Sequence, residues 1–473
     1  MNSTLLEAGS DVPGTVNFEP DAIQPKSLDP RVSATEVQSL ESTPDAVATA
    51  VKVSLNPWHA FAATWLGGVF DGMDSSIFAI VLYPALSELL HTTSHSDVGQ
   101  FGSYIIAMFM VGWAIGAVFF GWLADQIGRA KTLSITILLY ALFTGLCALA
   151  SNWWQLGLCR FLVGAGIGGE MGIGAVLLSE CWPKKTRVYA LSALATSLGV
   201  GYLLTAGLNL ALGSYGWRWL FVAGIVPAFL TVYMRMKLKD SDHFHEMKEK
   251  RDTAKNKLHE HRTEEDHAML SDSFKALLSA ENFKKTMIVG TLTSCAIIAW
   301  WAVLSWIPAW VNQITGELAV AERSQTMFFK DMGMILSGVI GGFLIKRLGY
   351  RLCMSSTFVM AFVTTVSMFL LFKSFTPLIF PLILLVGFFA HVPFVLLWSY
   401  IPELYSTRIR STAFGVTYNM GRIFAAMAAL GSGYLIRCFG GSYALAASSF
   451  ALIFLVGALA ALWMPQPTGD MID

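Results

Sequence analysis

Charged side chains are scarce in this chain. Asp, Glu, Lys and Arg make up 14% of the 473 residues, whereas a soluble domain usually carries about 25%. Apolar residues reach 55% and the mean hydropathy is +0.56, which excludes an ordinary water-soluble domain. The formal net charge of zero says little about partners, because the charges lie between the apolar runs. We expect the lipid bilayer, and no nucleic acid, as a partner.

Residues typical of metal and catalytic sites are also few. The six cysteines are dispersed, and no two have the spacing of a metal or redox motif. His243 and His245, like His259 and His261, lie two residues apart, so neither pair shares a helical face. No nucleophile–base pair or set of metal ligands is recognisable. We therefore expect no enzyme, no cofactor and no metal.

Long apolar runs dominate what remains. Each covers roughly 20 residues, the length that crosses a bilayer. Their hydrophobicity is continuous and not alternating, so they predict helices, which satisfy their own backbone in lipid. The sequence predicts an all-α membrane protein whose twelve transmembrane helices cover about 58–88, 99–122, 131–150, 154–180, 188–212, 217–236, 285–312, 325–346, 352–373, 377–401, 411–437 and 442–464.

Two motifs occur once in each half of the chain. A loop that begins at Gly121 returns at Gly342, an offset of 221 residues. The Glu-to-Arg segment 180–187 returns as 403–410, an offset of 223. Nearly equal offsets predict two pseudo-symmetric six-helix bundles, and paired halves are typical of alternating access around a central site.

Composition predicts the remaining domains. Residues 1–57 are polar and rich in Ser, Thr and Pro, which indicates a disordered tail. Residues 237–284 are densely charged and indicate a partly helical linker. Lys and Arg are concentrated in this linker and in alternate loops, so the positive-inside rule places both termini in the cytoplasm, in a multi-pass protein of the cell membrane. The predicted domains are the tail 1–57, the bundles 58–236 and 285–464, the linker 237–284 and the tail 465–473.

The loop 121–131, Gly-x-x-x-Asp-x-x-Gly-Arg-x-Lys, resembles the signature loop of the major facilitator superfamily. The resemblance covers about 58–464 and implies the major facilitator fold. It also implies that Asp125 and Arg129 join a cytoplasmic charge network that latches the two bundles in the outward-open state. The second copy departs from the family pattern, because Lys346 occupies the acidic position.

Two further segments resemble subgroups of that superfamily. The segment 160–183, with Arg160 and Glu170, is similar to the fourth helix of the sialate:proton symporter group, which includes lactate and sialic acid permeases; Met171 replaces the usual Trp. Asp71-Gly-Met-Asp74 resembles the related aromatic-acid:proton symporters. These resemblances imply proton-coupled transport of an organic acid.

Glycines recur at four-residue spacing in two predicted helices. Gly112 and Gly116 lie in one helix, and Gly164, Gly168 and Gly172 lie in the other. This spacing lets another helix approach closely. The second run formally matches a dinucleotide fingerprint, but no strand precedes it, so we interpret it as a packing surface.

Charges within the predicted spans are costly and mark candidate functional sites. Asp71 and Asp74 are three residues apart, share a helical face and lie about 20 Å along their helix. Two carboxylates so placed do not both ionise readily, which suits a proton carrier. We predict proton coupling by Asp71, Asp74 and Glu170; alternatively, one aspartate is structural and pairs with a basic group.

Arg422 is the strongest candidate for substrate binding. Its guanidinium offers a fixed two-pronged donor to a carboxylate and does not lose its charge. We predict that it binds an anionic substrate with Arg160, Asn419, Trp301 and His391. The alternatives are an internal ion pair for Arg422, a hydrogen-bonded packing role for His391 and a membrane-interface role for the tryptophan.

The duplicated Glu and Arg residues predict a gate. We expect latch pairs within each repeat, Glu180 with Arg187 and Glu403 with Arg410. The predicted cytoplasmic gate comprises Asp125, Arg129, Glu180, Arg187, Glu403 and Arg410.

Taken together, these features predict a secondary transporter that acts as a monomer and takes up a small organic anion with a proton. A monocarboxylate is favoured over a neutral sugar. The alternatives are proton-driven efflux, sugar or phosphate transport by the same fold, and a membrane receptor or sensor that binds its ligand without transport.

Overall fold

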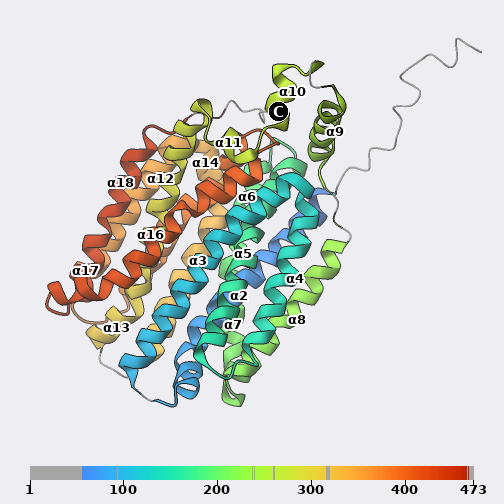
Figure 1. The fold of residues 1–473 in the computed structure, drawn as a ribbon. Helices are drawn as coiled ribbons and strands as arrows, with labels where there is room; N and C mark the ends of the chain where they lie inside the picture. Colours follow the sequence, from blue (N-terminus) through green and yellow to red (C-terminus); the bar gives the residue numbers. More distant parts are fainter. Residues whose placement is uncertain are drawn as a thin grey trace, which may run out of the picture. The chain divides into compact units, whose positions relative to one another are not determined.

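The computed structural model describes residues 56–92, 94–236, 238, 240–258, 261–315, 320–465 and 467. Nearly all of the predicted N-terminal tail 1–57, and most of the predicted tail 465–473, lie outside these residues. The described part of the chain is helical and contains no strand. Figure 1 shows its long helices.

The first half of the chain forms six spans. The first begins after Asn56, whose side chain accepts a hydrogen bond from the backbone of Trp58, and Pro57 occupies the first helical turn, where a missing N–H costs nothing. The helices of this half are α2 (Pro57–Leu89), α3 (His95–Ile127), α4 (Arg129–Cys147), α5 (Trp153–Cys181), α6 (Arg187–Leu194), α7 (Thr196–Leu212) and α8 (Trp217–Met236).

Three short helices follow between the halves and belong to the charged segment. They are α9 (Asp242–Asn256), α10 (Glu264–Leu270) and α11 (Ser273–Leu277). The second half then contains α12 (Ala280–Ala302), the 3-10 turn η4 (Leu304–Trp306), α13 (Ile307–Thr315), α14 (Val320–Leu371), α15 (Ile379–Leu404), α16 (Arg410–Cys438), α17 (Tyr443–Phe450) and α18 (Leu452–Ala461).

Eight of the described segments are long and apolar enough to cross a membrane. One of them, Ala321–Leu371, contains two of the predicted spans; the residue between them, Gly349, is non-helical with φ of 75° and ψ of 165°, so the expected loop is a kink between two helices that share the label α14. The predicted span 285–312 is interrupted instead, and its helix restarts at Ile307. Pro308 follows immediately and falls in the first turn of α13, where the missing N–H of proline leaves no helical hydrogen bond unmade.

The duplicated loop has the same backbone conformation in both copies. Gly128 has φ of 111° and Gly349 has φ of 75°, and the two glycines are 221 positions apart in the sequence. Residues with side chains rarely adopt this left-handed region. The repeat read from the sequence is therefore also a structural repeat.

The four-residue glycine spacing serves close packing, as predicted. In α3, Cβ atoms added to Gly112 and Gly116 would overlap the carbonyl oxygens of Phe161 and Ala165 in α5. The two halves also meet through glycine. In α16, a Cβ atom on Gly415 would overlap the carbonyl oxygen of Ala117 in α3, and Figure 1 shows these two helices side by side.

We predict that Gly116→Ala lowers the free energy of unfolding by about 1–3 kcal/mol, because the added methyl group forces α3 away from α5. Thermal unfolding in detergent measures the loss. Gly207→Ala in α7 is the matched control, since nothing lies within 4 Å of its Cβ position. Equal stability of the two variants would contradict the packing role.

Candidate functional site

A central cavity of about 50 Å³ is lined by helices of both halves. The first half contributes α3, α5 and α7, and the second half contributes α12, α14, α15 and α16. A cavity of this volume holds only a few water molecules, so it is small in this conformation. Its lining includes Trp113, Tyr202, Trp300, Trp301, His391 and Arg422.

Arg422 is the cation on the wall of this cavity. Its side chain is 6% exposed, and its guanidinium carbon lies 3.6 Å from the centre of the Trp113 ring. Its Nε donates a hydrogen bond of 2.6 Å to Oδ1 of Asn419. Among the described residues, no carboxylate lies within ion-pair distance of Arg422. An aromatic face and an amide oxygen therefore hold the charge in place and leave it available to an anion.

His391 and Trp301 line the same cavity. Nδ1 of His391 lies 2.7 Å from the hydroxyl oxygen of Ser337, and the imidazole packs against Trp300 with ring centres 5.7 Å apart. His391 is thus both hydrogen-bonded and packed against a ring, as in the packing alternative, and exposed to the cavity, as in the substrate-binding one. Trp301 contributes its indole to the cavity lining.

Asp74 and Arg160, predicted for separate tasks, contact each other. The guanidinium donates two hydrogen bonds to the carboxylate, of 3.1 Å and 2.7 Å, and the Thr144 hydroxyl donates a third of 2.7 Å. The rings of Phe78 and Phe109 each lie 4.8 Å from the guanidinium carbon. Neither charged residue lines the central cavity. This geometry matches the alternative predicted from the sequence, in which one of the two aspartates is structural and pairs with a basic group.

The two other predicted proton-coupling residues are also buried. Asp71 in α2 is 0% exposed and Glu170 in α5 is 2% exposed. A carboxylate oxygen of Glu170 accepts a hydrogen bond of 3.2 Å from the Thr136 hydroxyl. Neither acid is part of the cavity lining; both belong to helices of the first half.

Asp125 links the halves at the end of α3. Its carboxylate accepts hydrogen bonds from the backbone N–H groups of Ser411 and Thr412, of 3.2 Å and 2.8 Å, and from the Thr412 hydroxyl, of 2.7 Å. These groups form the N-terminus of α16, where the helix dipole favours negative charge. The contact of Asp125 with this helix N-terminus thus lies across the two halves.

Arg129 and Glu180 continue this contact. Arg129 donates to the carbonyl oxygen of Thr407 at 2.6 Å and lies 3.2 Å from a carboxylate oxygen of Glu180. The same oxygen lies 3.0 Å from Arg410 of the second half. We call Asp125, Arg129, Glu180 and Arg410 the interhalf charge cluster; all four are buried.

The pairing differs from the expected one. We expected Glu180 to pair with Arg187 of its own repeat, but its ion-pair partners are Arg129 and Arg410. Spacing along one helix end cannot reveal this exchange, because it depends on how the halves meet. Arg187 donates to the carbonyl oxygen of Trp182, and Glu403 accepts a hydrogen bond of 3.0 Å from the Tyr350 hydroxyl.

The segment between the halves covers the interhalf charge cluster. The Phe244 ring centre lies 4.8 Å from the guanidinium carbon of Arg129, and the Ser241 hydroxyl donates to Glu180. Arg251 donates to the carbonyl oxygen of Asp125. Burial lowers the pKa of the Arg251 guanidinium, which nevertheless stays charged at neutral pH. The linker therefore closes the cluster from water.

The sequence interpretation missed one ion pair near the cavity. Lys330 and Asp331 lie in α14, and their charged atoms are 2.9 Å apart. Both lie within the predicted span 325–346, so the rule that treats intramembrane charges as functional candidates would have found them. Trp113 and Tyr202 were also missed, because nothing in an apolar span distinguishes a cavity aromatic from a packed one.

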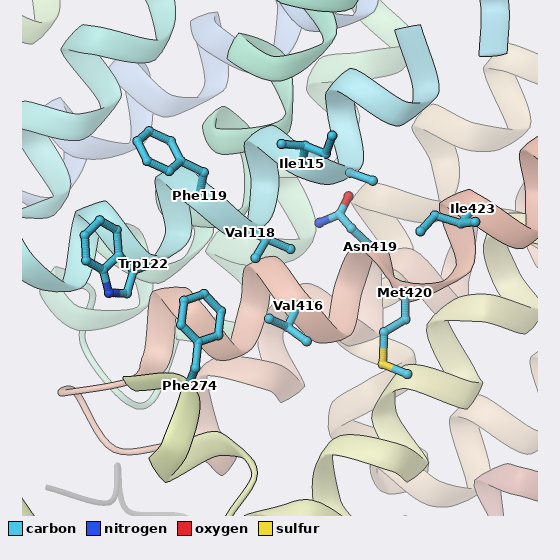
Figure 2. A pocket seen from close by; sticks show the side chains of 10 residues that line it. Ile115, Val118, Phe119, Trp122, Phe274, Val416, Asn419, Met420 and Ile423 are labelled. Atoms are coloured by element: carbon cyan, nitrogen blue, oxygen red, sulfur yellow. The ribbon is translucent and has the colours of Figure 1, made fainter. Parts of the chain in front are cut away.

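A second, larger cavity of about 550 Å³ lies between α3, α16 and α11. Figure 2 shows that Ile115, Phe119, Val416 and Met420 line it among other apolar side chains. Asn419 is its single polar lining residue in the described part of the chain. The described lining of this larger cavity contains no charged side chain that could bind a charged substrate. We therefore place the candidate site in the central cavity, although its volume is smaller.

Residues 64–429 match the Major Facilitator Superfamily. The chain is 27% identical over 426 residues to the cis,cis-muconate transport protein of Acinetobacter baylyi, covering 89% of this chain and 97% of that protein. It is 25% identical over 417 residues to a sialic acid transporter of Escherichia coli, covering 87% of this chain and 95% of that protein.

Solved structures agree on the fold. A proton:xylose symporter with 14% sequence identity has a TM-score of 0.70, covering 88% of this chain and 97% of the symporter. With the superfamily match, this confirms the predicted fold of twelve transmembrane helices in two bundles. The predicted resemblance to carriers of organic acids is likewise confirmed.

We predict that Glu180→Gln lowers the free energy of unfolding by about 3–5 kcal/mol, because it leaves two buried guanidinium groups without their shared carboxylate. Thermal unfolding of the purified protein measures the loss. Glu281→Gln is the control: Glu281 is 82% exposed and lies 3.7 Å from Lys285, and such pairs contribute about 0–1 kcal/mol. A loss no larger than that of the control would refute the role of Glu180.

Proposed function

The chain belongs to the Major Facilitator Superfamily, whose members are multi-pass membrane transporters, and on this premise we propose that it takes up a small organic acid together with a proton. The observation that carries the proposal is Arg422. A buried cation that faces a central cavity and lacks an ion-paired carboxylate among the described residues suits an anionic substrate.

The cavity supports an acid better than a neutral sugar. Its lining combines the guanidinium with three tryptophans, two tyrosines and a histidine, so it offers one strong anion contact among aromatic faces. The relatives named for muconate and sialic acid transport both carry carboxylic acids. We place Asn419, Trp301 and His391 with Arg422 in the substrate site; Arg160 is held by Asp74 and contacts substrate only if that pair opens.

For the proton we propose the pair of Asp74 and Arg160. Protonation of Asp74 removes the charge that stabilises the buried guanidinium of Arg160, so the ion pair weakens. Arg160 can then bind another anion. Asp71 and Glu170, buried in the same half, are the further proton-coupling candidates. No soluble nucleotide-binding motif interrupts the spans, so an ion gradient is the proposed source of energy.

For the gate we propose the interhalf charge cluster, with Arg187 and Glu403 beside it. Its contacts join the halves on the linker side, which the positive-inside rule assigns to the cytoplasm together with both termini. A closed cluster blocks the cytoplasmic path, so the conformation described here is closed on that side. We further propose a monomer in the plasma membrane.

We predict that Arg422→Ala abolishes binding of organic acids while the protein still folds and inserts. Arg422→Lys keeps the charge but loses the planar fork, so the apparent KM should rise by a factor of about 10, or about 1.4 kcal/mol. Thermal-shift titration and proteoliposome uptake with a panel of acids, including cis,cis-muconate and sialic acid, measure both effects.

The control is Arg347→Ala, which removes an exposed arginine in α14 away from the cavity. Normal stabilisation of Arg422→Ala by the transported acid would rule out the carboxylate contact. Loss of folding in Arg422→Ala, restored by neutralising a nearby acid, would support the internal ion pair instead.

We predict that Asp74→Asn loses concentrative uptake by a factor of at least about 10 but retains counterflow exchange. The amide mimics the protonated carboxyl, so the loaded carrier still moves although the coupling proton is lost. Proteoliposomes with and without an inward proton gradient separate the two activities, and a protonophore should collapse uptake by the wild type.

Asp74→Asn combined with Arg160→Gln controls for stability, because it removes both members of the ion pair. Wild-type accumulation by Asp74→Asn would sink the assignment of this residue. Uptake that requires sodium and does not depend on the proton gradient would contradict proton coupling. Ligand binding without any uptake would favour a receptor.

A further inference from the structure

Lys330 and Asp331 are a buried charge pair that the proposed function does not use. Their side chains are 11% and 12% exposed, and Nζ of Lys330 lies 2.9 Å from the Asp331 carboxylate. Consecutive residues of a helix do not face each other, so Lys330 reaches sideways to its neighbour. Such a pair neutralises the ammonium without fixing its position firmly, and another anion can replace the aspartate.

The ammonium of Lys330 lies against the aromatic wall of the central cavity. Its Nζ lies 5.2 Å from the Trp300 ring centre and 5.8 Å from the Tyr202 ring centre. Both rings line the cavity together with Arg422. Arg422 lies on Trp113 of α3, whereas Lys330 extends from α14. Arg422 therefore lines the cavity directly, and Lys330 lies next to it, against two of the rings of its wall.

We propose that Lys330 is the second anion contact of the central site and that the substrate is a dicarboxylate. One carboxylate binds Arg422, and the other replaces Asp331 at Lys330 once the cavity opens. This inference rests on the proposed transport of an organic acid, and it replaces the monocarboxylate favoured by the sequence with an acid that carries two anionic groups.

Charge balance supports this arrangement. Arg422 and Lys330 together carry two positive charges, which two carboxylates neutralise if Asp331 is protonated. Asp331 then acts as the counter-ion of Lys330 in the empty site and releases it in the loaded one. Among the described residues, the other titratable groups of the cavity lining are Tyr202, His391 and Tyr418. Loading of a dianion therefore requires a proton at Asp331, independent of the pair in the first half.

The test compares acids that differ by one carboxylate. Proteoliposome uptake and thermal shift are measured with succinate against butyrate, adipate against hexanoate and phthalate against benzoate. The wild type should prefer a diacid over its matched monoacid by at least about tenfold. Lys330→Gln should remove this preference and leave monoacid binding within about twofold. Lys330→Arg should keep it, as should Asp331→Asn, which mimics the protonated acid.

The outcomes separate the two proposals. Equal loss of diacids and monoacids in Lys330→Gln, or loss of diacid binding in Asp331→Asn, would show a merely structural ion pair and overturn this inference. A wild type that prefers monoacids would also overturn it, while organic-acid transport would stand. No binding or uptake of any acid by the wild type would overturn both. Lys373→Gln, at an exposed loop position, should match the wild type throughout; if Lys330→Gln does not fold, Asp331→Asn and the wild-type preference decide.

Discussion

The carboxylate of Glu180 lies between two guanidinium groups, Arg129 of the first half and Arg410 of the second. Removing three such charges from water costs several kcal/mol for each ion, and only a complete set of partners offsets this cost. Asp125 adds its hydrogen bonds to the start of α16. The contact is therefore favourable only while both halves and the linker exclude water from it. Once water enters, hydration of the same charges favours separation, so one set of residues can support two conformations.

Two of the buried arginines, Arg160 and Arg422, show how environment decides the role of a charge. Arg160 has an internal carboxylate as its partner, whereas Arg422 is held by an indole face and an amide oxygen. Contact with a desolvated aromatic ring stabilises a cation by about 2 kcal/mol. Burying the cation costs several kcal/mol of hydration free energy, so the ring offsets only part of that cost. Arg422 thus stays charged and positioned but incompletely neutralised. Such an arginine suits the reversible binding of a carboxylate that we propose.

The fold could be predicted from the sequence because each span is a local pattern, and the repeat could be predicted because Gly128 and Gly349 need the same unusual backbone. The placement of Arg422 at a central cavity followed from the cost of charge in lipid. The contact between Asp74 and Arg160 could not be predicted, since they lie 86 residues apart and spacing reports only one helix at a time. The rule that treats charges within a span as functional candidates also applies to Lys330, but we interpreted its segment only as part of an apolar run.

The meeting of α3 and α16 through Gly415 and the Ala117 carbonyl has a kinetic consequence. A contact between two backbones contains no side-chain rotamers that must unlock before the helices move past each other. Such a surface keeps the two helices in contact and offers little resistance when one helix slides or rotates along the other. At the Gly415 contact itself the resistance to such sliding is therefore small. It comes instead from the other contacts of this region, such as Arg422 of α16 over the Trp113 ring of α3 and the interhalf charge cluster.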